Sequence, residues 1–117
     1  MITGLDLLST VDYKLKEDSE PKTVFKLGII PSYLFALISE DDKLSNIEKA
    51  YRILQLTIRG WDNFSGTEHT MAKENIYGRE IYVTPISLLE KIPMKVVTEL
   101  SVKAMELNQL TEPERKN

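Results

Sequence analysis

The sequence of 117 residues contains no cysteine and a single histidine, His69. Without cysteine the chain cannot form disulfides, use a thiol nucleophile or hold zinc or iron–sulfur centres through thiolates. One histidine excludes metal motifs built from histidine pairs and argues against a catalytic triad. The isolated glycines form no phosphate-binding loop. We therefore expect no catalytic, metal or cofactor-binding residues, and predict that the protein is not an enzyme.

The chain also has no excess of positive charge and no long hydrophobic run. It carries 15 Lys and Arg against 18 Asp and Glu, a net charge of −3, whereas nucleic-acid-binding domains usually carry a basic patch. No apolar run approaches the ~20 residues of a membrane span, and the first residues do not read as a secretory signal. We therefore expect no nucleic acid, membrane or small-molecule substrate as partner.

The length suits one domain, which we place at residues 1–110, with a polar tail at 111–117. Residues 11–16 alternate apolar and polar side chains, as a half-buried strand does. Residues 22–28 resume this alternation after a polar loop at 17–21. The two segments predict an N-terminal β-hairpin.

Helices are predicted at four places. A short one follows Pro31 over residues 32–38. A longer one begins after Ser45, which forms a capping box with Glu48 in the first turn. Apolar residues continue at helical spacing as far as Trp61, and Gly60 is placed to end that helix in a left-handed conformation. A short helix is expected after Pro85, and the last one over residues 93–108.

The segment at residues 62–73 has no apolar period and predicts a loop. Residues 79–84 are a candidate third strand. The resulting fold class is α+β: an N-terminal hairpin, joined by the candidate third strand, packs with a central long helix and a C-terminal helix.

Two polar features have structural explanations. Glu40, Asp41 and Asp42 precede a helix, where negative charge is favourable, and they lack the spacing of a calcium loop. His69 stands in a polar segment without a nucleophile, so we expect an ordinary surface histidine.

Aromatic residues supply the candidate interface. Trp61 continues the apolar stripe, so we favour a core role for it over partner binding. Phe64 is open to either role, because aromatics near loops often anchor partner proteins. Tyr13 and Phe25 on the hairpin and Tyr82 on the third strand complete the candidate protein-interface residues. The exposed edges of the hairpin are natural places for another subunit to pair.

Residues 56–64, with Gly-Trp-Asp-Asn-Phe at their end, resemble a helix-to-loop signature in small proteins of tailed bacteriophages. The similarity extends to the hairpin segments 13–16 and 23–25, to residues 89–93 before the last helix, and to residues 107–117. Residues 65–70 depart from the acidic, glycine-containing turn that often follows in such proteins.

This resemblance implies a role in building or decorating the phage particle, and it brings no catalytic residues with it. One role is a virion protein of the capsid or head–tail region. Another is a tail assembly chaperone that binds the tape-measure or tail tube protein and then leaves. Its partners would be other phage structural proteins or copies of itself, in the virion or in the host cytoplasm during assembly. A small host adaptor is the alternative outside this class.

Overall fold

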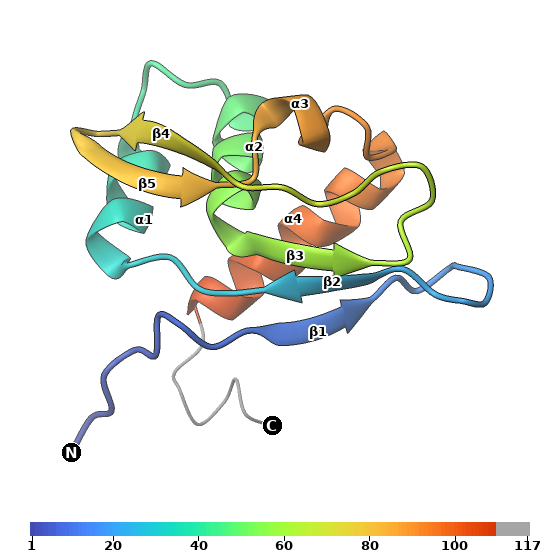
Figure 1. The fold of residues 1–117 in the computed structure, drawn as a ribbon. Coiled ribbons are helices and arrows are strands. Elements are labelled where there is room, and N and C mark those ends of the chain that lie inside the picture. The colour runs from blue at the N-terminus through green and yellow to red at the C-terminus, as the bar shows by residue number, and fades with distance from the viewer. Residues whose placement is uncertain (110–117) are drawn as a thin grey trace.

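The computed structural model describes residues 1–109, which form five strands and four helices (Figure 1). In chain order the elements are β1 (Val11–Lys14), β2 (Val24–Leu27), α1 (Ser32–Glu40), α2 (Asn46–Thr57), β3 (Ile58–Asp62), β4 (Ala72–Ile76), β5 (Arg79–Val83), α3 (Ile86–Leu89) and α4 (Met94–Gln109). The α+β class is confirmed. The polar tail predicted at 111–117 lies outside the described residues.

The N-terminal hairpin is confirmed, but its third strand is not the expected one. Strands β1 and β2 pair antiparallel, with Tyr13 opposite Phe25. The third strand of this sheet is β3, which pairs antiparallel with β2. Trp61 of β3 is the partner of Phe25, so Phe25 lies between Tyr13 and Trp61 across the sheet. Residues 79–83 are a strand, as predicted, but they pair with β4 in a separate two-stranded sheet.

The β4–β5 hairpin begins at Ala72, within the segment 62–73 that was expected to be loop, and β4 was not predicted as a strand. Its turn places Tyr77 and Gly78 at φ values of 50° and 83°, the positive φ at both central residues that the tightest hairpin turn requires. Glycine adopts this conformation without steric cost. Tyr77 and Gly78 therefore form the turn that joins β4 to β5.

The helix starts are those that the sequence predicts. Ser45 accepts a hydrogen bond from the Glu48 amide, and the Glu48 carboxylate accepts one from the Ser45 amide. This reciprocal cap satisfies two amides that the first turn of α2 would otherwise leave unpaired. Helices α1, α3 and α4 each begin directly after a proline, namely Pro31, Pro85 and Pro93.

The end of α2 differs from the prediction. The helix stops at Thr57, and the chain continues straight into β3, so Gly60 is a strand residue facing Lys26 and not a left-handed helix cap. Ile58 and Trp61 fit a helical spacing from Leu54, but pairing with β2 gives their backbone sheet hydrogen bonds instead. The left-handed residue is Asn63, with φ 60°, directly after β3.

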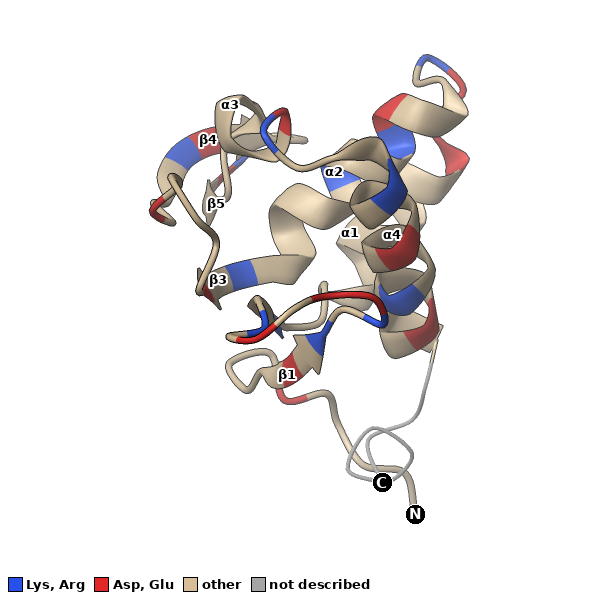
Figure 2. Ribbon diagram, turned by 90° about the vertical axis from the view of Figure 1, so that its right-hand side faces the viewer, with Lys and Arg blue, Asp and Glu red and all other residues tan. Residues whose placement is uncertain are grey.

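Helix α2 lies at the centre of the molecule, in contact with α1, α3 and α4. Helix α4 runs along one face of the three-stranded sheet, and the β4–β5 hairpin lies on the far side of α2 (Figures 1 and 2). The core is continuous across these layers, and its completely buried side chains include Leu34, Ile38, Leu54, Ile58, Val83, Leu89 and Leu100. None of the helices described here is long and apolar enough to cross a membrane.

Candidate protein-interaction site

Three aromatic rings pack together at the end of the three-stranded sheet. Phe25 and Trp61, neighbours across β2 and β3, meet edge to face with ring centroids 5.9 Å apart. Phe64 lies 5.2 Å from Trp61 and 6.2 Å from Phe25. Such edge-on pairs contribute about 0.5–1.5 kcal/mol each beyond their burial. The cluster therefore anchors the segment after β3 to the core.

The turn at Asn63 brings Phe64 back over this cluster. The left-handed conformation of Asn63 reverses the chain, and asparagine tolerates it better than most residues do. The Asn63 side-chain amide donates to the Lys22 carbonyl (3.2 Å), and the Thr23 hydroxyl donates to the Asn63 carbonyl (2.8 Å). The Gly-Trp-Asp-Asn-Phe segment thus joins β3 to the loop that connects β1 and β2.

The indole N–H of Trp61 holds the following loop in place by donating to the Thr67 carbonyl at 3.0 Å. The Thr67 amide donates in turn to the Phe64 carbonyl (3.1 Å). Trp61 is 7% exposed and Phe25 1%. The core role predicted for Trp61 is therefore confirmed, and the same burial keeps both rings from reaching a partner. As direct interface residues, Phe25 and Trp61 are corrected to core residues.

His69 differs from the surface histidine that was expected, because it is half-buried beside Trp61. Its ring lies edge-on to the indole, with centroids 4.7 Å apart. Its Nε2 is 2.8 Å from the Thr84 hydroxyl, which donates its own hydrogen to the Ile58 carbonyl at 2.8 Å. Nε2 must therefore carry a hydrogen and donate it to Thr84. Burial lowers the pKa of His69, which favours the neutral ring.

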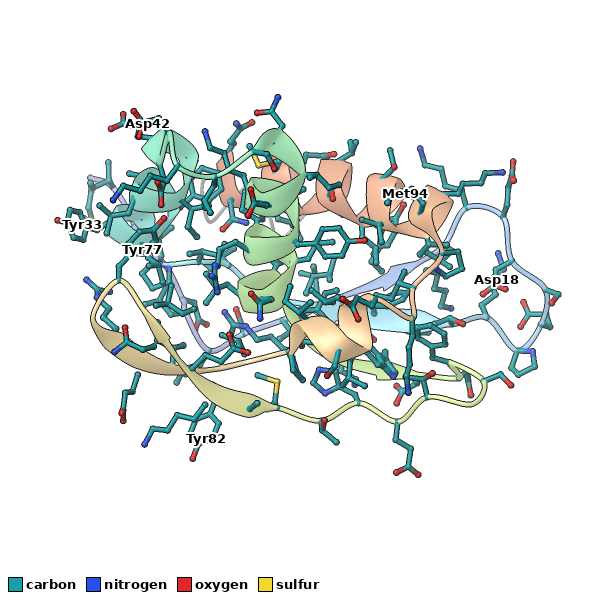
Figure 3. The ribbon with its side chains drawn as sticks, turned by 90° about the horizontal axis from the view of Figure 1, so that it is seen from above. Asp18, Tyr33, Asp42, Tyr77, Tyr82 and Met94 are labelled. Carbon is teal, nitrogen blue, oxygen red and sulfur yellow. The ribbon has the colours of Figure 1, made fainter. Side chains whose placement is uncertain are left out.

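A groove of about 850 Å³ opens beside the cluster, between the β1–β2 loop and the segment after β3. Phe64, which is only half-buried, lies along it. Among residues 1–109, no lysine or arginine lines this groove, whereas four carboxylates do, those of Asp18, Glu20, Asp62 and Glu68. Asp18 lies at the opposite end of the molecule from Tyr33 and Tyr77 (Figure 3). We call this feature the acidic groove. Its aromatic and acidic lining fits a partner that presents an apolar side chain flanked by basic residues.

The remaining predicted interface residues lie elsewhere. Tyr82 is 65% exposed on β5 and points away from the ribbon (Figure 3). Tyr13 is half-buried on β1, and its hydroxyl donates to the Glu99 carboxylate of α4 at 2.5 Å. Burial, followed by this hydrogen bond and the charge of Glu99, raises the pKa of Tyr13 to about 12. The five predicted residues therefore do not form one surface.

The acidic residues at the end of α1 do not gather into a cation site. Across residues 1–109, no three acidic or histidine side chains lie in an arrangement that would hold a metal ion. Asp41 instead accepts hydrogen bonds from the Tyr77 hydroxyl (2.5 Å) and the Lys43 amide (3.0 Å). The bond from Tyr77 is the main reason that the pKa of Asp41 is lowered. Asp41 thereby ties the tip of the β4–β5 hairpin to the α1–α2 connection.

Arg59 is a structural residue that the sequence did not single out. Its guanidinium donates to the carbonyls of Leu56 (3.0 Å), Ile29 (2.7 Å) and Leu7 (3.2 Å). Burial lowers its pKa. Next to it, a side chain at Gly28 would come within 2.7 Å of the guanidinium carbon. One arginine thus joins the end of α2, the β2–α1 connection and the N-terminal segment, and no local pattern marks such a contact.

Comparisons with protein-family models, with curated proteins and with solved structures find no match for this chain.

Proposed function

We propose that this chain is a non-enzymatic structural or assembly protein of a tailed bacteriophage, acting through protein–protein contacts in the capsid or head–tail region. The observation that carries the proposal is the position of the Gly-Trp-Asp-Asn-Phe segment, the part of the sequence that resembles phage proteins. Its Trp61 is buried, its Asn63 makes the turn, and its Phe64 borders the acidic groove.

The acidic groove supplies the chemistry of the proposed contact. A half-exposed aromatic ring between acidic side chains offers apolar contact area at its centre and charge at its rim, the usual arrangement of a protein interface. Lys26 lies 3.8 Å from Asp62, an exposed pair that screens only one of the four carboxylates. The charge that remains favours a basic partner surface and speeds its approach.

A tail assembly chaperone is the second candidate, and the segment before β1 favours it. Residues 1–10 are exposed throughout, and Ile2 and Leu8 keep 96% and 91% of their surfaces exposed. Exposed apolar side chains of this kind suit the temporary binding of an apolar partner during assembly. Proteomics of purified particles separates the two roles, because a virion protein is present in many copies and a chaperone is absent.

Replacement of Phe64 by alanine tests the proposed contact. Phe64 is half-buried, so we expect Phe64→Ala to fold and yet to reduce the yield of assembled particles. Phe35→Ala is the matched control: Phe35 is also half-buried against the core, but it lies on α1, away from the acidic groove. Urea denaturation would establish that the two variants have similar stability.

Equal losses of particle yield in the two variants would assign Phe64 to packing alone. Failure of the purified protein to bind any particle protein would contradict the phage proposal itself.

A further inference from the structure

We propose that two copies of this chain pair through the outer edges of their β1 strands, antiparallel and with Tyr13 opposite Tyr13, to form one six-stranded sheet. The proposal extends the assembly function by naming one partner, a second copy of the chain. It rests on that function only for where the dimer would act.

The β1 edge is the open edge of the three-stranded sheet. In the order β1-β2-β3, β1 is at one side, and no described element lies beside its outer edge (Figures 1 and 2). The other side, at β3, is less open: the Ile58 carbonyl accepts from the Thr84 hydroxyl, and the side chain of Trp61 holds the segment after β3 close by through its bond to the Thr67 carbonyl. Unpaired backbone groups at an open edge favour the addition of another strand.

The charges on β1 are complementary to themselves. Asp12 and Lys14 are exposed, and neither forms an ion pair with another residue of 1–109. With Tyr13 opposite Tyr13, the Asp12 of each copy faces the Lys14 of the other, which gives two opposite-charge pairs across the new edge. A shift of the pairing by two residues in one direction sets Asp12 against Asp12. A shift by two residues in the other direction sets Lys14 against Lys14, although it also sets Asp12 against the exposed Lys16. Of these three alignments, only the one with Tyr13 opposite Tyr13 sets no like charges of this strand against each other.

Lysine at a sheet edge often prevents association, but here it has a partner of opposite charge in the second copy. On the face toward α4, the same alignment places Val11 against Leu15 and Tyr13 against Tyr13. Val11 and Tyr13 are half-buried in the single chain, so pairing would cover apolar surface that remains open.

A groove of about 530 Å³ beside this edge fits the same partner. It lies between Tyr13 of β1, Leu15 just after this strand, and the side of α4 that carries Val102, an apolar residue that is 64% exposed. A second sheet extending from β1 would bring its own α4 to this face, because a two-fold axis puts the helices of both copies on the same side of the joined sheet.

The β4–β5 hairpin is a weaker candidate for the same role. If β5 paired with a second β5 around Ile81, Glu80 would face Tyr82 and no opposite charges would meet. Glu80 already has an ion pair within the chain, 3.3 Å from Lys73.

Charge reversal tests the proposal in the purified full chain. Asp12→Lys sets lysine against Lys14, and Lys14→Asp sets aspartate against Asp12, so each replaces two attractive pairs by two repulsive ones. Sedimentation velocity over a range of micromolar concentrations should show dimers of the unaltered chain. It should show dissociation constants raised roughly tenfold or more in either variant. The double variant restores opposite charges and should restore the dimer.

Lys73→Asp is the matched control, since it reverses an exposed strand charge on the other sheet and should leave the dimer intact. Circular dichroism would establish that the variants fold. If a single variant does not fold, the dimerisation of the folded double variant still tests the proposal. A chain that stays monomeric, or a dimer that does not respond to the two reversals, would overturn the proposal. A double variant that stays monomeric would overturn it too. Such results would leave the virion proposal open to its own test, which depends on particle assembly and Phe64.

Discussion

The guanidinium of Arg59 holds three distant segments together, and its removal should reduce stability strongly. Its bonds to the carbonyls of Leu56 and Ile29 are half-buried, and the bond to Leu7 is exposed. Hydrogen bonds to a charged group contribute ~1.5–3 kcal/mol each. The two half-buried bonds would give ~3–6 kcal/mol, which the desolvation of the guanidinium offsets in part. We expect Arg59→Met, which keeps most of the side-chain volume, to lower the free energy of unfolding by about 3 kcal/mol.

Urea denaturation followed by tryptophan fluorescence measures this change, because Trp61 is two residues along the same strand. With a denaturant slope of ~1.5 kcal/mol/M, a loss of ~3 kcal/mol lowers the midpoint by about 2 M. Arg52→Met is the control. Arg52 is on α2, where it forms a 3.8 Å ion pair with the partly exposed Glu74 and donates one hydrogen bond (3.0 Å) to the side-chain oxygen of the buried Gln55. Its loss should cost about 1–2 kcal/mol, less than the loss of Arg59.

Gly28→Ala perturbs the same contact from the other side, since the added carbon would displace the guanidinium. A flexible methionine at position 59 tolerates that carbon better, so the two substitutions together should cost less than the sum of their separate effects. The reasoning about Arg59 would be refuted if Arg59→Met destabilised the protein no more than Arg52→Met, or if the two effects simply added.

Two further predictions concern the cap of α2 and the half-buried His69. Ser45→Ala removes the acceptor for the Glu48 amide and should cost about 1 kcal/mol in urea denaturation, whereas Ser45→Asp, which keeps an acceptor, should cost less. His69 has a lowered pKa in the folded state, so the unfolded chain binds its proton first as the pH falls. Stability from this residue is complete well above pH ~6.5 and is lost below it. Between about pH 7.5 and 5.5, His69→Asn should therefore lose less stability than the unaltered protein, and equal losses would contradict this assignment.

Features that depend on residues close in sequence were predicted well. The capping box of Ser45 and Glu48, and the prolines before α1, α3 and α4, act within one helical turn, so the sequence contains all that decides them. The hairpin of β1 and β2 followed from simple alternation. The core position of Trp61 was also predicted, since an apolar stripe continues to it whether the segment is helix or strand.

Features that depend on residues far apart in the sequence were not predicted. Residues 58–61 fit both a helix and a strand, and only the backbone of β2, more than thirty positions earlier in the chain, decides for the strand. Strand β4 has one strongly apolar residue, Ile76, so its pairing with β5 supplies most of its order. The half-buried state of His69 depends on Thr84, and the role of Arg59 on Gly28 and Ile29.

The direct passage from Thr57 to Ile58 has a consequence for how this chain can vary. With no loop between helix and strand, one inserted residue would exchange the inward and outward faces of β3 and turn Trp61 out of the core. An insertion in the connections at residues 15–23 or 63–71 would not reverse the faces of a strand in this way, because each of these connections is a loop. Homologous chains should therefore differ in length at those two connections and keep the spacing from Ser45 to Trp61 constant. This constant spacing can be used as a fixed reference when distant sequences are aligned.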